Sequence, residues 1–332
     1  MATVGSGVTS LCPLTEQIAG IAAERMLSRD IFAPARAIAP VVGRTGRTGT
    51  GVKDATRKGV NLQDSPNMLT AVGLYSDEFP MRRDQYTTYT YALTLFKLDE
   101  FQLPDRIRAQ WANVALVDQA ARVAEAESLI AEHAHARLVY SAATTAANWD
   151  SNHAFDGGNI TSTSYDFMDL CNDARVLLLK AQTWTPGAEL AVVIPDDVYY
   201  HVQRLDQARY SVGALSAGSG GAAYLTEDMV QAFVGGVLPG AKVYRVSSYY
   251  TAASGTVTAD MTGCILFIPV VNGTTAPLVT NAPLDTEGAI DLISLRSERN
   301  EKIPADIFYA ELDCSVQVIE NTGAVLAHTL LS

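Results

Sequence analysis

The chain is poor in the residues that build metal and redox sites. Its 332 residues include 4 cysteines and 5 histidines. Cys12, Cys171, Cys264 and Cys314 form no CxxC pair and have few histidines nearby. Zinc sites and disulfide frameworks place these residues at short, regular spacings, so the scatter argues against both. We expect no metal, no cofactor and a reducing compartment.

Positive charge and long apolar runs are also scarce. The 24 Lys and Arg residues against 36 Asp and Glu give a net charge of −12, which would repel a polyphosphate. The most apolar run, residues 264–271, is far shorter than the roughly 20 residues of a membrane helix. The N-terminus lacks the basic start and apolar core of a signal peptide. We expect a soluble protein without a general nucleic-acid site, not exported by the conventional route.

Catalytic motifs are missing from the sequence: neither GxSxG nor HExxH occurs. The best candidate acids are Asp196 and Asp197, which follow the apolar run AVVIP. Pro195 ends that run, and either aspartate can accept hydrogen bonds from the free amides of a first helical turn. A catalytic pair is the alternative, but adjacent helical residues point about 100° apart and no supporting base or nucleophile is near. The sequence favours a helix cap and predicts no enzyme.

One spacing resembles a metal motif. Glu132 and His135 stand three apart in EHAHA, as in carboxylate-bridged di-iron helices. That site needs a second such pair, and His153, His201 and His328 belong to none. Surface or packing roles are therefore favoured.

The chain does contain a compact basic segment. Residues 43–59, GRTGRTGTGVKDATRKG, carry five basic residues and one acid among glycines and threonines. Val52 stands where a phosphate loop has its lysine, which argues against that motif. Charge alone could hold nucleic acid, but an acidic neighbouring copy fits the net charge better. The candidate contact residues are Arg44, Arg47, Lys53, Arg57 and Lys58.

The 48% apolar content is ample for a core. The periodicity of the apolar residues predicts the remaining elements. Alternation over residues 88–95 predicts a strand, which with the basic segment makes a long two-stranded hairpin needing outside support. A helix of about 35 residues, some 50 Å long, should run from 104 to 143, with Val123 and Ile130 on its apolar face. Further expected elements are a helix capped at Thr163 and Asp166, strands at 190–194, 242–246 and 265–271, helices at 196–205 and after Thr226, and antiparallel strands in the last fifty residues.

This order of elements resembles the major capsid proteins of tailed double-stranded DNA bacteriophages. Their fold, the Hong Kong ninety-seven type, is shared with encapsulin shells. The resemblance covers nearly the whole chain. It is carried by LPDRIRAQW, by AEAESLIAEHAHARLVY, and by WTPGAELAVVIPDDVYYHV followed by LTEDMVQAFVGG and AKVYRVSSYY.

The resemblance implies an α+β fold in four parts. These are an N-terminal arm (1–42), an extended β-hairpin loop (43–101), a peripheral domain with a long spine helix (102–183 and 283–332) and an α/β axial domain (184–282). It also implies a structural, non-enzymatic protein that assembles as hexamers and pentamers into an icosahedral shell around double-stranded DNA. The alternatives are an encapsulin-like compartment or, less favoured, a cytosolic α/β enzyme.

The same resemblance implies the partners and the location. The expected partners are many copies of the chain itself, a separate scaffolding protein, a portal and a decoration protein. Packaged DNA would be contacted only non-specifically, and no membrane would be involved. The expected location is the virion capsid, assembled in the host cytoplasm. Some relatives join their subunits by lysine-to-asparagine cross-links; although Lys53 and Lys58 lie in the loop, we expect no cross-link because no partner asparagine can be assigned.

Overall fold

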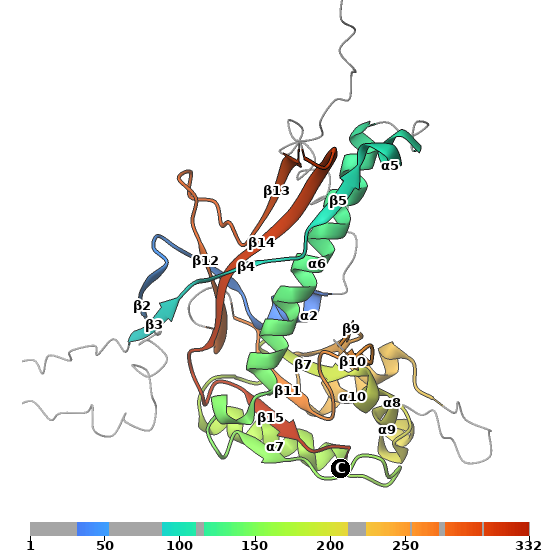
Figure 1. Ribbon diagram of the computed structural model, residues 1–332. Helices are drawn as coiled ribbons and strands as arrows, with labels where there is room; N and C mark the ends of the chain where they lie inside the picture. The colour runs from blue at the N-terminus through green and yellow to red at the C-terminus, as the bar shows by residue number, and fades with distance from the viewer. Residues whose placement is uncertain are drawn as a thin grey trace, which may run out of the picture.

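The structure, a computed structural model, describes residues 32–52, 88–110, 116–211, 224–252, 254–271, 276–300 and 302–331. It combines two main β-sheets with a long helix, which confirms the predicted α+β class. Figure 1 shows an elongated molecule in which helix α6 runs from one sheet to the other. Among the described residues, no helix is long and apolar enough to cross a membrane.

The first sheet has six strands. Its order is β1-β12-β14-β13, and β4 and β5 also pair with the long strand β14. β1 runs parallel to β12, and the other pairs are antiparallel. The strands are β1 (Val41–Arg44), β4 (Thr94–Lys97), β5 (Phe101–Pro104), β12 (Leu278–Pro283), β13 (Ile293–Asn300) and β14 (Ala305–Val318).

The second sheet has five strands in the order β6-β15-β11-β7-β8. β7 pairs parallel with β8 and antiparallel with β11. β15 pairs antiparallel with β11 and parallel with β6. The strands are β6 (Ala154–Asp156), β7 (Leu190–Pro195), β8 (Ala241–Val246), β11 (Ile265–Pro269) and β15 (Val325–His328).

Two short ribbons and a set of helices complete the described fold. The ribbons are β2 (Thr48–Val52) with β3 (Thr88–Ala92), and β9 (Tyr249–Thr251) with β10 (Val257–Ala259). The helices are α2 (Ala33–Ile38), α5 (Asp105–Gln110), α6 (Leu116–Thr144), the 3-10 turn η3 (Ala146–Asn148), α7 (Phe167–Lys180), α8 (Asp196–Val202), α9 (Asp206–Ser211) and α10 (Glu227–Val237).

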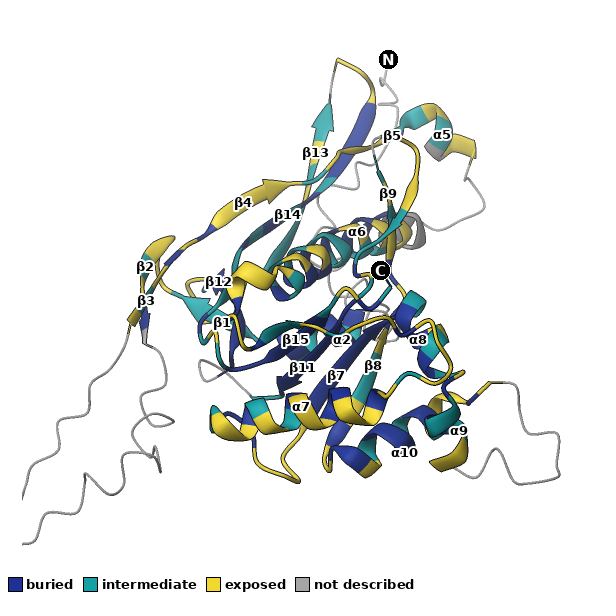
Figure 2. Ribbon diagram, turned by 90° about the horizontal axis from the view of Figure 1, so that it is seen from below, coloured by how far each residue is buried: buried dark blue, intermediate teal, exposed yellow. Residues whose placement is uncertain are grey.

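The five-stranded sheet is buried on both faces, which explains why β7 is a continuous apolar run. Leu190, Val192 and Ile194 belong to the core formed with α7, α8 and α10, whereas Ala191 and Val193 belong to the core formed with α2 and α6. Successive strand residues point to opposite faces, so both sets must be apolar. Figure 2 shows these dark blue strands between α7 and α10 on one side and α6 on the other.

Helix α6 has 29 residues, about 43 Å at 1.5 Å per residue. It is shorter than the predicted single helix: α5 ends at Gln110, and residues 111–115, which would join the two, lie outside the described chain. Val123 is buried as predicted, but Ile130 is 50% exposed, so its placement on the apolar face was wrong. The buried face passes through Ala131 instead.

The N-terminal caps of two further helices were also predicted from the sequence. Thr226 caps α10, since its side chain accepts a hydrogen bond from Met229 N, and this prediction is confirmed. The start of α7 differs: Asp166 is itself the N-cap and accepts from Asp169 N at 3.0 Å. The predicted capping box beginning at Thr163 is therefore wrong by one turn, because Gln207 binds Asp166 at 2.8 Å and fixes the start there.

The cores also cut across the expected division of the chain. α7 and β15 pack into the same core as β7 and α10, although the predicted boundaries at residues 183 and 283 would separate them. Conversely, β12 lies within the stretch assigned to the axial part but pairs in the six-stranded sheet. β14 and β15, expected as neighbouring antiparallel strands, belong to different sheets. The chain thus crosses between its two sheets near its C-terminal end.

His135 lies where α6 meets β12 and gives a prediction for acid stability. It is 1% exposed, and its Nε2 lies 2.9 Å from Thr280 Oγ1. Burial, aided by repulsion from Arg36, lowers the pKa of His135 from 6.5 to about 4. The unfolded chain therefore binds one more proton than the folded chain between these values. The resulting stability is fully present above pH 6.5 and is lost as the pH falls towards 4, at up to about 1.4 kcal/mol per pH unit.

We therefore expect His135→Gln to flatten the fall in free energy of unfolding between about pH 6.5 and 4. Denaturant unfolding at several pH values, followed by circular dichroism, measures this slope. Equal slopes for the original chain and His135→Gln would contradict the assignment.

Candidate functional site

The sequence singled out the basic segment at the base of the hairpin. β2 and β3 pair antiparallel, from Thr48 opposite Ala92 to Val52 opposite Thr88, which confirms a two-stranded hairpin at this position. Arg44 and Arg47 lie in the described residues. The other three candidates, Lys53, Arg57 and Lys58, lie outside them.

Arg44 is bound within its own chain. Its Nε donates to Asn281 Oδ1 at 2.7 Å, and its Nη2 donates to the hydroxyl of Tyr89. The guanidinium carbon lies 5.5 Å from the centre of the Tyr89 ring and 4.9 Å from that of Tyr91. The Tyr89 hydroxyl in turn donates to Asn281 Oδ1 at 3.1 Å. We call Arg44, Tyr89, Tyr91 and Asn281 the Arg44 cluster; it joins β1, β3 and β12.

The glycines of β2 make room for these tyrosine rings. Gly49 lies opposite Tyr91, and Gly51 lies opposite Tyr89. A Cβ atom at Gly49 would lie 2.8 Å from the Tyr91 hydroxyl, and one at Gly51 would collide with the Tyr89 ring. The rings therefore cover the glycine strand, a cross-strand packing that supports residues lacking side chains. This explains the TGTGV sequence of β2 opposite TYTYA.

Burial favours the protonated, neutral form of the Tyr89 hydroxyl. Burial raises the pKa of Tyr89 above 10.0, and the opposing effect of the Arg44 charge does not reverse this. The neutral hydroxyl can therefore accept from Arg44 and donate to Asn281 at the same time.

Arg47 makes a second link from the base of the hairpin. Its Nη2 lies 2.6 Å from Asp313 Oδ2 of β14, while its backbone carbonyl accepts from Leu93 N at 2.7 Å. The Arg47 side chain is 61% exposed and that of Asp313 13%. Both arginines were predicted to bind another copy. In the structure Arg44 binds Asn281 and Tyr89 of its own chain, and Arg47 binds Asp313.

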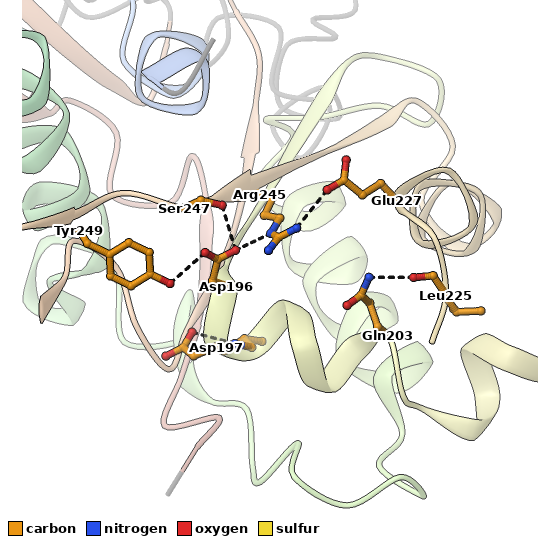
Figure 3. Close-up of polar contacts among 9 residues, drawn as sticks. Asp196, Asp197, Gln203, Leu225, Glu227, Arg245, Ser247 and Tyr249 are labelled. Carbon is orange, nitrogen blue, oxygen red and sulfur yellow. Dashed lines mark hydrogen bonds and ion pairs between the residues drawn. The ribbon is translucent and has the colours of Figure 1, made fainter. Parts of the chain in front are cut away.

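The aspartates at the end of β7 form a polar network, drawn in Figure 3. Asp196 Oδ1 accepts from the Nε of Arg245 and from Ser247 Oγ at 2.9 Å, and its Oδ2 accepts from the Tyr249 hydroxyl at 2.9 Å. Arg245 Nη1 also donates to Glu227 Oε1 at 3.1 Å. These contacts tie α8 to the end of β8, to β9 and to the start of α10.

Asp197 and Gln203 hold the same helix at two other places. Asp197 Oδ2 accepts from the Thr262 hydroxyl and, at 3.1 Å, from Gly263 N. Gln203 Nε2 donates to Leu225 O at 2.7 Å (Figure 3). Pro195 is the N-cap and makes no side-chain cap bond, so the predicted capping role is wrong for Asp196 and limited to one Val198 N bond at 2.7 Å for Asp197. The two aspartates mainly attach the start of α8 to β8, to β9 and to residues 262–263, which lie close to the end of β7.

The protonation of Asp196 fits this structural role. Burial raises its pKa, but hydrogen bonds from Arg245, Tyr249 and Ser247 outweigh burial and hold the pKa below 3.8. A general base needs a pKa near the working pH and an unoccupied oxygen facing a substrate. Both oxygens of Asp196 accept bonds from neighbouring side chains, so the residue is suited to anchoring.

The side chains of the EHAHA stretch make polar contacts with neighbouring elements. Glu132 Oε2 lies 3.6 Å from Arg36 Nη1, while His135 binds Thr280. His133 Nε2 lies 2.6 Å from Asp260 Oδ2, whose side chain is fully buried. Within the described residues, no group of three or more His, Cys, Asp or Glu side chains could hold a metal ion.

No family model and no curated protein matches the chain. A phage-related protein from Bordetella bronchiseptica RB50 matches with 12% identity and a TM-score of 0.68, over 95% of this chain and 96% of that one. The capsid of cyanophage P-SCSP1u matches with 12% identity and a TM-score of 0.51, over 88% and 86%. The virus-like particle from Pyrococcus furiosus matches with 12% identity and a TM-score of 0.50, over 94% and 98%.

These likenesses define the class of fold. The chain has the capsid-shell fold of the Hong Kong ninety-seven type, and the resemblance stated from the sequence is confirmed at the level of fold. The matches extend over nearly the full length of each chain, so both sheets and the long helix are included.

Sequence reasoning missed one member of the Arg44 cluster, Asn281. Tyr89 and Tyr91 were visible as a strand pattern, but Asn281 is 237 positions from Arg44 and belongs to no motif. A usable signal was the pairing of GTG with YTY, since glycine opposite an aromatic residue is a recurring cross-strand arrangement.

Asp196 yields a stability prediction. Asp196→Asn removes the charge that receives bonds from Arg245, Ser247 and Tyr249. We expect a loss of about 1–3 kcal/mol at pH 7, the usual contribution of hydrogen bonds to a charged group. Because the folded pKa is depressed, this difference is present at neutral pH and shrinks as the pH falls below the unfolded value of 3.8.

Denaturant unfolding at pH 7 and pH 3 measures this effect. Asp206→Asn is the control, since its pair with Arg209 spans 3.8 Å and the Asp206 side chain is 46% exposed, where such pairs contribute little. Equal stability of Asp196→Asn and Asp206→Asn at pH 7 would disprove the anchoring role.

Proposed function

We propose that this chain is the structural subunit of an icosahedral shell, a major capsid protein that assembles as hexamers and pentamers around the double-stranded DNA of a tailed bacteriophage. The observation that carries the proposal is the capsid-shell fold over nearly the whole chain. The protein acts by geometry and not by catalysis, in keeping with aspartates that anchor α8.

The described surface supports assembly. Leu95 and Phe96 of β4 and Phe101 of β5 are 44%, 37% and 40% exposed on one stretch of the six-stranded sheet. The β2–β3 ribbon pairs with no further strand among the described residues. An isolated ribbon has marginal stability in water, and exposed apolar side chains are unfavourable there. Both would be stabilised by contact with another copy.

The four-part division of the chain forms part of the proposal, although the cores extend across two of its boundaries. The arm is 1–42, the extended loop 43–101, the peripheral part 102–183 with 283–332, and the axial part 184–282. Because α7 and β15 share a core with β7, the axial part would move together with these two elements.

Contacts between copies are proposed to involve the basic loop. Lys53, Arg57 and Lys58 of one copy would meet acidic surface on the next, in a chain whose net charge is −12. Arg44 and Arg47 contribute by fixing the base of the loop, since both bind side chains of their own chain.

The proposed partners follow from the shell role. They are further copies of the chain, a separate scaffolding protein, a portal and a decoration protein, with packaged DNA contacted only non-specifically. The excess of acidic residues fits an inner shell surface that repels DNA and therefore does not bind it tightly. The site of action is the virion capsid, assembled in the host cytoplasm.

Assembly is tested by size. Sixty chains of 35.5 kDa form a closed shell of about 2 MDa, so the purified chain should elute as a large particle and show hollow shells by electron cryomicroscopy. Particles from the native source should contain nuclease-protected DNA. A stable monomer would disprove the shell, and a protein cargo in place of DNA would favour the compartment.

The loop contact is tested by charge. Replacing Lys53, Arg57 and Lys58 together by glutamine should reduce shell yield at low salt and weaken the dependence of assembly on salt, because exposed ion pairs are screened. The matched control neutralises three exposed cations elsewhere: Arg106, Lys242 and Lys302. Light scattering during assembly from 50 to 500 mM salt compares them. Identical salt curves for both triple variants would refute the contact.

A further inference from the structure

The hairpin is attached to the body by few contacts. Within the described residues, β2 and β3 pair only with each other. One more backbone bond, from Leu93 N to Arg47 O at 2.7 Å, closes the ribbon at its base, and the chain joins the six-stranded sheet at Thr94, which pairs opposite Cys314. A two-stranded ribbon that joins the sheet only at its base can swing, so side chains at the base must fix its direction.

Two arginines link the ribbon to the six-stranded sheet, and their contacts differ in strength. Tyr89 of β3 also packs against the core cluster of Ala276, Val279 and Ile319. Arg47 makes one ion pair with Asp313 and is 61% exposed, a setting in which such pairs contribute about 0–1 kcal/mol. Arg44 is half-buried and makes two hydrogen bonds and two ring contacts. The Arg44 cluster is therefore the stronger constraint on the ribbon.

The geometry of the Arg44 cluster fixes orientation as well as distance. Arg44 belongs to β1, where it lies opposite Pro283, so it is anchored in the six-stranded sheet. Its planar guanidinium donates sideways to Asn281 of β12 and to Tyr89 of β3, and lies over the rings of Tyr89 and Tyr91. A planar group bound at its edge and its face cannot rotate freely, whereas a lysine ammonium supplies only a point charge. The tyrosine rings are in turn seated on Gly49 and Gly51 of the opposite strand.

We propose that Arg44 is the positioning residue that sets the direction in which the hairpin leaves the subunit, and thereby the uniform geometry of contact with the adjacent copy. This inference rests on the proposed shell function. A rotation at the base turns the whole β2–β3 ribbon, and with it the surface that the ribbon offers to another copy. A closed shell repeats one contact many times, so a spread in this direction becomes a spread in particle size.

The first measurement concerns the unassembled chain. Arg44→Gln and Arg44→Lys should speed amide hydrogen exchange in β3 about tenfold, equivalent to about 1.4 kcal/mol. Exchange in β7 should stay unchanged. Tyr89→Phe, which keeps the ring and loses the hydroxyl, should give a smaller increase and serves if the Arg44 variants fail to fold. Arg296→Gln is the matched control, because Arg296 is equally exposed, at 60%, and also pairs with an acid of β14, Glu311, but belongs to β13 and not to the hairpin; it should have little effect on β3. Unchanged exchange in β3 for Arg44→Gln would overturn the proposal.

The second measurement concerns shells. Arg44→Gln should broaden the particle-size distribution seen by electron cryomicroscopy, and Arg44→Lys should broaden it as well, whereas Arg296→Gln should give the same distribution as the original chain. Uniform particles from Arg44→Gln would refute the positioning role while leaving the shell function intact. If the original chain forms no particles, the shell function fails, and faster β3 exchange would still establish the Arg44 constraint on the hairpin.

Discussion

The packing of α6 against both sheets is the interaction on which the rest of the molecule depends. Near its C-terminal end, Ala136, Val139 and Tyr140 pack in the core beneath the five-stranded sheet. Nearer its N-terminal end, Val123 packs with Phe308 of β14 in the six-stranded sheet. Each sheet would otherwise expose an apolar face, so a single helix of about 43 Å both completes two cores and sets the distance between them.

The elements that the sequence predicted well are those whose signals are local. β7 is a continuous apolar run because both its faces are covered, and Thr226 caps α10 through an amide three residues away. Ile130 misled because helical periodicity gives the width of an apolar face but not which residues turn towards the sheets. Asp166 replaced Thr163 as a cap because Gln207, 41 positions away, binds it.

The contacts that the candidate residues make within their own chain could not be predicted from the sequence. A basic segment at the base of a hairpin is visible from composition, and the two described arginines do lie there. Their partners are Asn281 and Asp313, brought close only by pairing of β1 with β12 and by β14. No periodicity or spacing links residues more than 200 positions apart, so a positive charge that composition assigns to another copy can instead be used within the chain.

This use of charge matches what a closed shell requires of its subunit. Many modest contacts hold a shell together, and their combined strength exceeds that of any single one. No individual contact then needs to be strong, but each must recur at nearly the same angle, since closure tolerates little accumulated error. A half-buried guanidinium bound at its edge and its face adds little energy to the shell, but it restricts direction. In the proposed shell, the geometry of the hairpin base would therefore contribute to assembly through orientation.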